Sequence, residues 1–163
     1  MGTKARDIVG VDITKLVTLL NKAYADEWLA YYQYWVGSKV AIGRMRGIIA
    51  KELEEHANEE LEHAGMLTER IIQLGGSPLL TPQDWLKESG CGYAAPKDPN
   101  TKKLLEQNIK GEQCAITTYK KILDFVRNKD DVTEHIIREI LEDEVEHEED
   151  LEAMLKDIDT PVK

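Results

Sequence analysis

The chain has 163 residues, enough for one domain with a buried core. Its formal net charge of −10 disfavours nucleic acid as a general partner, because phosphate binding needs a basic surface, and favours attraction of cations. No apolar run approaches the roughly 18 residues of a transmembrane helix, and two cysteines are too few for a disulfide scaffold, so we expect a cytoplasmic protein.

The first half of the chain predicts one pair of long helices. Residues 1–11 are polar and lack the apolar segment of a secretory signal, so we expect an N-terminal tail. Asp12 is a suitable N-cap for a first helix that ends near Gly37. A short turn through Gly43 leads to a second helix that ends at Gly75–Gly76.

The second half predicts another pair after a long crossover. Within the crossover, residues 81–86 combine a cap, a proline and two large apolar side chains, which predicts a short helix packing on a neighbour. A third long helix is expected after Asp98–Pro99, and a fourth from Asp131, where Asp131 and Glu134 resemble a capping box. With a C-terminal tail at 159–163, residues 1–163 form a single all-α domain, a four-helix bundle with one long crossover.

Each predicted long helix carries an apolar seam in steps of three and four residues, and one glutamate interrupts each seam near its middle. Four uncompensated carboxylates in one core would cost far more than the roughly 5–15 kcal/mol by which a domain is stable. Cations are therefore expected among them. The four residues are Glu27, Glu60, Glu112 and Glu144.

Two of these glutamates begin Glu-x-x-His motifs, Glu60 with His63 and Glu144 with His147. Residues three apart share a helical face, so each carboxylate and imidazole can bind the same ion. Four Glu and two His are typical of di-iron and di-manganese carboxylate centres in helical bundles. The alternative is chance occurrence on solvated faces of a chain with 31 acidic residues, but two motifs in seam register favour metal binding.

Three further residues lie on the metal-facing stripes. Tyr34 follows Glu27 by seven residues, and Tyr119 follows Glu112 by seven, which is two helical turns. Each phenol is either a core aromatic with a satisfied hydroxyl or a group that hydrogen-bonds a carboxylate or gives an electron near the metals. His56, four residues before Glu60, is an extra metal ligand, an iron-uptake residue or a structural histidine.

The segment 60–78, from Glu60-Leu-Glu-His63 to Gly76-Ser-Pro78, closely resembles helix B of bacterioferritins, and 143–147 with 151–152 resembles their helix D. The resemblance spans residues 12–158. Bacterioferritins carry a haem-ligating methionine directly after the helix B glutamate, where this chain has Leu61, so no haem is expected. The resemblance implies a ferroxidase centre for two iron ions, with manganese as an alternative metal, made of Glu27, Glu60, His63, Glu112, Glu144 and His147.

Other features resemble Dps mini-ferritins, which form cages of twelve: a short helix in the crossover, and no fifth helix after the fourth. Dps proteins bind iron across a subunit interface, whereas this chain holds a full ligand set. That combination resembles thioferritins, which also carry two cysteines near the site. Cys91 and Cys114 fit this pattern, and we expect them to lie within disulfide reach. Two unrelated reduced thiols are the alternative.

The resemblance implies a homo-oligomeric cage subunit, a ferroxidase that oxidises Fe(II) with hydrogen peroxide or dioxygen, stores iron and protects against oxidative stress. Cation uptake is expected at the corner between the third and fourth helices, through Asp130, Asp131 and Glu134. DNA binding is not expected, because of the net charge. The alternative is a non-storing di-metal enzyme, a rubrerythrin-like peroxidase or a manganese catalase.

Overall fold

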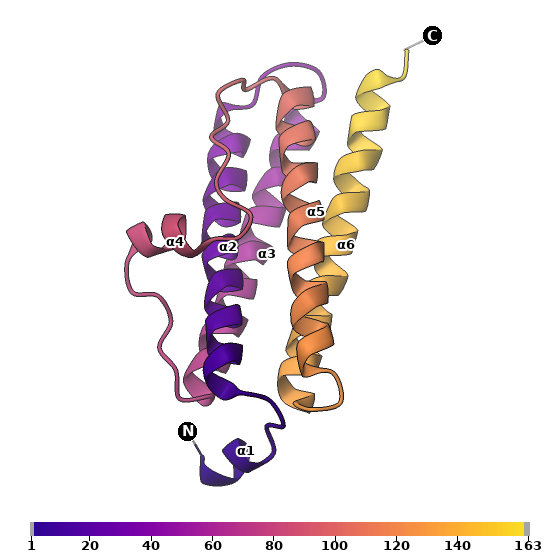
Figure 1. Cartoon of the computed structure of the whole chain (residues 1–163). Helices are drawn as coiled ribbons and strands as arrows, with labels where there is room; N and C mark the ends of the chain where they lie inside the picture. Colours follow the sequence, from indigo (N-terminus) through magenta and orange to yellow (C-terminus); the bar gives the residue numbers. More distant parts are fainter. Residues whose placement is uncertain (1, 162–163) are drawn as a thin grey trace.

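A computed structural model of the chain describes residues 2–161 and has six helices in that range (Figure 1). The predicted tails include residues 1, 162 and 163, which lie outside the described part. The N-terminal tail contains one short helix. None of the described helices combines the length and apolarity that a membrane span requires. The helices are α1 (Thr3–Asp7), α2 (Ile13–Val40), α3 (Arg46–Gln73), α4 (Pro82–Glu88), α5 (Thr101–Val126) and α6 (Asp131–Asp159).

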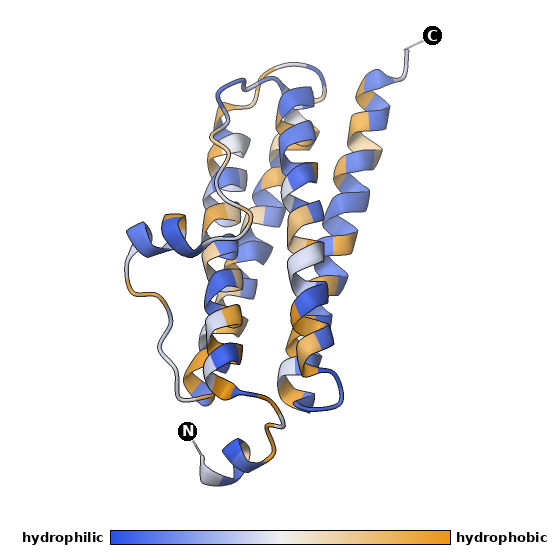
Figure 2. Cartoon of the chain, viewed as in Figure 1, coloured by the Kyte–Doolittle hydropathy of each residue, from blue (hydrophilic) through white to orange (hydrophobic). Residues whose placement is uncertain are grey.

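The predicted all-α bundle with one long crossover is confirmed. Helices α2 and α3 form one hairpin, α5 and α6 form the other, and the crossover runs along α2 before α5 begins (Figure 1). The predicted crossover helix is α4, and its Trp85 stacks on Trp28 of α2 with ring centroids 4.7 Å apart. Apolar positions recur among hydrophilic ones along each long helix (Figure 2).

The helix ends follow from local capping chemistry. Asp12 caps α2 as predicted, and its carboxylate accepts a hydrogen bond from the Lys15 amide at 2.9 Å. Helix α3 ends where Gly75 adopts a φ of +78°, which favours glycine at a helix C-terminus. The predicted cap of α5 was two residues early, because Asn100 rather than Asp98 accepts the hydrogen bond from the Lys102 amide.

The predicted capping box of α6 is wrong in detail. Asp130 is the N-cap and accepts a hydrogen bond from the Thr133 amide at 3.2 Å. The Glu134 carboxylate instead accepts from the Asn128 amide and from Arg138, so it braces the preceding turn.

The core is divided into two apolar clusters along the bundle axis. One contains Leu16, Leu67 and Ile137, and the other contains Leu53 and Leu151. The seam glutamates of the four long helices lie between the two clusters, in a polar layer enclosed by apolar side chains. This layer holds the candidate functional site.

Candidate metal centre

All four seam glutamates and both motif histidines meet in this layer, and each is at most 3% exposed. Their ligand atoms form two groups of four, and the atoms within each group lie within 4.8 Å of one another. Glu60 and Glu144 belong to both groups. Glu27 and His63 complete the first group, and Glu112 and His147 complete the second.

The two histidines are oriented by acids from the opposite helix. His63 of α3 has Nε2 3.1 Å from Asp143 of α6, and His147 of α6 has Nε2 2.8 Å from Glu59 of α3. When Nε2–H donates to these carboxylates, each Nδ1 presents its lone pair to the centre. His63 Nδ1 accordingly lies 3.4–3.5 Å from carboxylate oxygens of Glu27, Glu60 and Glu144.

Glu59 and Asp143 were not identified from the sequence as functional residues. Both motifs read acid-Glu-x-x-His, with Glu59 directly before Glu60 and Asp143 directly before Glu144. That repetition is the signal that could have revealed them. It was obscured because both acids lie in runs of charged residues.

Each of the two tyrosines likewise donates a hydrogen bond to a glutamate of the other hairpin. The Tyr34 hydroxyl of α2 donates to Glu112 of α5, and the Tyr119 hydroxyl of α5 donates to Glu27 of α2. Both phenols are buried, and burial together with the nearby carboxylates raises their pKa values well above the usual range. The tyrosines therefore remain protonated donors that fix the orientation of two carboxylates.

The donor set suits divalent cations because several of its atoms are buried and have no hydrogen-bond partner among the described residues. These atoms are Glu27 Oε2, both carboxylate oxygens of Glu144, His63 Nδ1 and His147 Nδ1. Buried acceptors without donors are costly, whereas a cation supplies the missing positive charge. Carboxylate oxygens and imidazole nitrogens are ligands that iron and manganese accept.

Protons take the place of cations when the metal is absent. Burial and neighbouring carboxylates raise the pKa of Glu60 and Glu112 well above the usual value, and that of Glu144 to about 8. Burial also opposes ionisation of Glu27, but the proximity of His63 and Glu60 leaves the pKa of Glu27 below its usual value. Hence the metal-free centre holds protons that bound cations would displace.

We expect the metal-free protein to lose stability as the pH rises from about 5 to above 8. The Glu144 carboxyl group has a pKa of about 8 in the folded protein, above its ordinary value of 4.5. Its contribution to the stability of the folded state is therefore complete below pH 4.5 and is lost as the pH rises through 8. Urea unfolding with a chelator across this range measures the effect, and Co(II)-loaded protein should show a smaller decline. A metal-free stability that rises over the same window contradicts the prediction.

His56 lies beside the centre but in neither group of four. It is 3% exposed, and its ring stacks on His147 with centroids 4.1 Å apart. Burial, with a smaller contribution from His147, lowers the pKa of His56 to about 3, so the imidazole is neutral.

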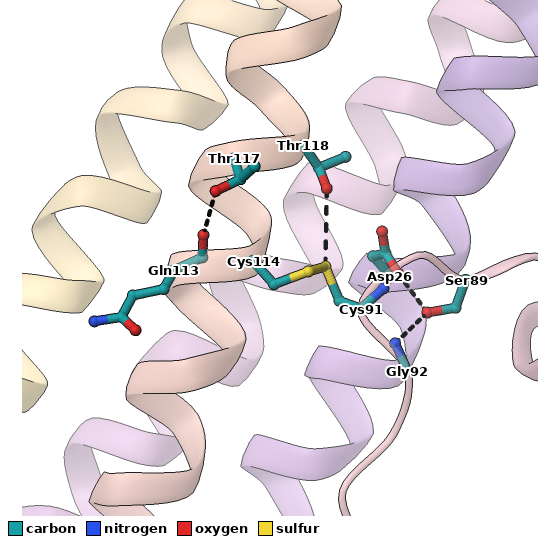
Figure 3. Close-up of a disulfide and its surroundings, with 8 residues drawn as sticks. All are labelled: Asp26, Ser89, Cys91, Gly92, Gln113, Cys114, Thr117 and Thr118. Carbon is teal, nitrogen blue, oxygen red and sulfur yellow. Dashed lines mark hydrogen bonds between the residues drawn. A yellow bond between two sulfur atoms is a disulfide. The ribbon is translucent and has the colours of Figure 1, made fainter.

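Cys91 and Cys114 form a disulfide with Cα atoms 5.8 Å apart, within the reach that we predicted (Figure 3). The disulfide joins the crossover to α5 at Cys114, which follows Glu112 by two residues. The Cys91 amide also donates to Asp26 of α2 at 2.9 Å, and the Ser89 hydroxyl donates to the same carboxylate oxygen. The crossover is thus attached to both α2 and α5.

A cavity of about 590 Å³ lies under this attachment. Its wall includes Cys91 and Tyr93 of the crossover, and its inner end includes Glu27, Glu112 and Glu144. The disulfide therefore borders a space that reaches the candidate centre from the α2–α5 side.

The predicted cation pore at the α5–α6 corner is wrong for Asp130. Its carboxylate is 1% exposed and accepts two hydrogen bonds from Arg70 Nη2, at 2.9 and 2.8 Å. Glu134 is paired with Arg138. These acids neutralise arginines and cap a helix, so Asp130 and Glu134 are not free to attract cations.

Residues 17–160 match the ferritin-like domain, and the chain belongs to this family. It is 33% identical to the DNA protection during starvation protein of Pyrococcus furiosus, over 90% of this chain and 80% of that protein. It is 30% identical to the bacterioferritin of Rhodobacter capsulatus, over 86% of this chain and 83% of that protein.

A solved structure of the dodecameric thioferritin of Bacteroides fragilis, a bacterioferritin-related protein, is also similar. Its TM-score is 0.95 at 43% identity, and the match covers 96% of this chain and 95% of that one. The resemblance to bacterioferritin-related and Dps-like proteins is confirmed.

Proposed function

We propose that the chain, as one ferritin-like domain, is a ferroxidase and iron-storage subunit of a homo-oligomeric cage. The observation that carries the proposal is the pair of four-residue groups that share Glu60 and Glu144. Two Fe(II) ions bound there are held side by side by common carboxylates, which suits the removal of one electron from each by a single oxidant.

In this proposal Glu60 and Glu144 bridge the two ions, while Glu27 and Glu112 each bind one. Hydrogen peroxide accepts the two electrons and two protons to give two waters, and both irons become Fe(III). Asp143 and Glu59 keep the histidine Nδ1 atoms directed at the ions, and the two tyrosine hydroxyls restrain Glu112 and Glu27. Consumption of Fe(II) and peroxide together protects against oxidative stress.

We further propose that the cage has twelve subunits, as the thioferritin of Bacteroides fragilis does. The Cys91–Cys114 disulfide secures the crossover over the centre, and its reduction opens the α2–α5 side to iron release. By the loop-entropy relation, closing a loop of 23 residues contributes about 3 kcal/mol to stability.

Iron loading followed by sizing tests the storage function. We expect a particle near twelve times the 18.5 kDa chain mass that acquires an electron-dense mineral after Fe(II) and peroxide are added. Size exclusion and electron microscopy report the two properties separately. A dimer that turns over peroxide without forming a mineral would instead support the non-storing peroxidase or catalase.

A further inference from the structure

The disulfide joins two cysteines with different surroundings. Cys91 belongs to the wall of the cavity of about 590 Å³ under the crossover, whereas Cys114 of α5 is not among the residues that line it. A small molecule that enters this cavity therefore contacts Cys91 and not Cys114. When the disulfide is reduced, Cys91 is the cysteine that such a molecule meets first.

A hydroxyl group lies beside the sulfur of Cys91. Thr118 follows Cys114 by one turn of α5, and its Oγ1 is 3.8 Å from Cys91 Sγ (Figure 3). A disulfide sulfur carries no proton, so the Thr118 hydroxyl is the donor. After reduction the same hydroxyl is placed to donate to the Cys91 thiolate, and a hydrogen bond to the charged form favours that form. The thiolate is the nucleophilic state of cysteine.

Hydrogen bonds that do not involve sulfur position the segment that carries Cys91. The Cys91 amide donates to Asp26 at 2.9 Å, and the Ala94 amide donates to Gln33 at 2.9 Å. Both acceptors are side chains of α2. These hydrogen bonds do not require the disulfide, so after reduction they favour return of the crossover to the position in which the Cα atoms of Cys91 and Cys114 are 5.8 Å apart. That distance allows the two thiols to pair again.

We propose that the reduced Cys91–Cys114 pair is a thiol peroxidase site for hydrogen peroxide, with Thr118 as the donor to the Cys91 thiolate. The thiolate attacks one peroxide oxygen, so that an S–O bond forms and the O–O bond breaks, and the leaving hydroxide takes a proton to become water. The Cys114 thiol then attacks the sulfur of the Cys91 sulfenic acid, which forms the S–S bond and releases a second water. Across both steps the two thiols lose two electrons, and one peroxide is reduced to two waters.

Neither step involves a metal, so the proposal does not rest on the proposed function of the di-metal centre. Each reduced chain consumes one peroxide and then carries the disulfide of the present structure. A low-molecular-weight thiol restores the dithiol by thiol–disulfide exchange and is itself oxidised to a disulfide. The pair therefore removes peroxide when no Fe(II) is present to reduce it.

Peroxide treatment of the reduced, assembled protein in the presence of a chelator tests the activity. We expect both thiols of a chain to be lost for each peroxide consumed, at a rate above that of the same chain unfolded in urea. In the variant Cys114→Ser the sulfenic acid should persist on Cys91, where dimedone traps it and mass spectrometry locates it. In Cys91→Ser we expect no such adduct on Cys114, because Cys114 does not border the cavity.

The role of Thr118 has its own pair of variants. Thr118→Val should slow the loss of thiols about tenfold, near the lower end of what a hydrogen bond to an ionised group contributes. The matched control is Thr117→Val on the same helix, because the Thr117 hydroxyl donates to the Gln113 carbonyl at 2.8 Å and not to sulfur (Figure 3). The control should react at the wild-type rate. Equal rates for the two variants would overturn the assignment of Thr118 as the donor.

A wild type that loses its thiols no faster than the unfolded chain overturns the proposal, and this measurement needs no variant. An adduct on Cys114 as abundant as that on Cys91 also overturns it. The variant Glu144→Gln separates the thiol site from the di-metal centre, because it should lose Fe(II) oxidation and keep the peroxide-dependent loss of thiols. If the loss of thiols disappeared with Fe(II) oxidation, residual iron at the centre would account for it and the thiol site would be refuted.

Discussion

Replacement of Glu144 with glutamine is expected to slow Fe(II) oxidation at least about 100-fold, the upper end of what the loss of a supporting ligand costs. Glu144 belongs to both groups of four and is 1% exposed, so the substitution removes a shared anion from both proposed metal positions. Glutamine keeps the volume of the side chain, which should preserve the fold. Absorbance of Fe(III) after rapid mixing with peroxide measures the rate.

The matched control is Glu62→Gln, the same substitution at an exposed position on α3. It should leave oxidation unchanged. Stability supplies a second measurement, since the pKa of Glu144 is about 8. At pH 9 the metal-free Glu144→Gln variant should be more stable than the wild type, because it has no charge to bury. If the Glu144→Gln variant oxidised Fe(II) at the wild-type rate, the assignment of Glu144 as a metal ligand would be refuted.

Replacement of Arg70 with alanine is expected to cost about 3–5 kcal/mol of stability, the range for breaking a buried ion pair from one side. Arg70 and Asp130 are 4% and 1% exposed, and Arg70 Nε also donates to Thr133 at 2.7 Å. The substitution leaves the Asp130 carboxylate buried without its cation. It also loosens the contact between α3 and the first turn of α6.

Two further variants make the Arg70 prediction specific. Arg138→Ala removes a more exposed arginine from its pair with Glu134 and should cost no more than about 1 kcal/mol. Adding Asp130→Asn to Arg70→Ala should recover part of the loss, because asparagine is uncharged and still caps a helix. Urea unfolding at fixed protein concentration compares them. If Arg70→Ala lowered the free energy of unfolding by less than about 1 kcal/mol, the Arg70–Asp130 pair would contribute no more than an exposed ion pair does.

The sequence was sufficient to predict the bundle and to single out the six residues that meet in the polar layer, because both depend on periodicity within single helices. A glutamate in an apolar seam faces the core whatever its neighbours are. The partnership of Glu59 with His147, and of Asp143 with His63, depends on how α3 packs against α6. No pattern within one helix specifies that contact.

The role of Asp130 was missed for the same reason. An acid between two helices is expected in solvent, where it can attract cations. Its burial is determined by Arg70, which lies 60 residues earlier in the chain and approaches only when the hairpins pack. The cap of α5 was placed early because Asp98 and Asn100 are both good caps, and the choice between them depends on tertiary contacts. The Ile42 amide of the α2–α3 turn donates a hydrogen bond to the Pro99 carbonyl, and the Ile42 carbonyl accepts one from the Thr101 amide. These two hydrogen bonds fix where α5 starts.

The exchange of supporting groups between the hairpins makes the geometry of the candidate centre depend on the folding of both hairpins. The α2–α3 hairpin carries Glu27 and His63, but the residues that orient them, Tyr119 and Asp143, come from the α5–α6 hairpin. A nascent or damaged chain with only one hairpin folded holds scattered acids rather than an oxidation centre. If the proposed function holds, oxidation at this centre requires a subunit in which both hairpins are folded and packed.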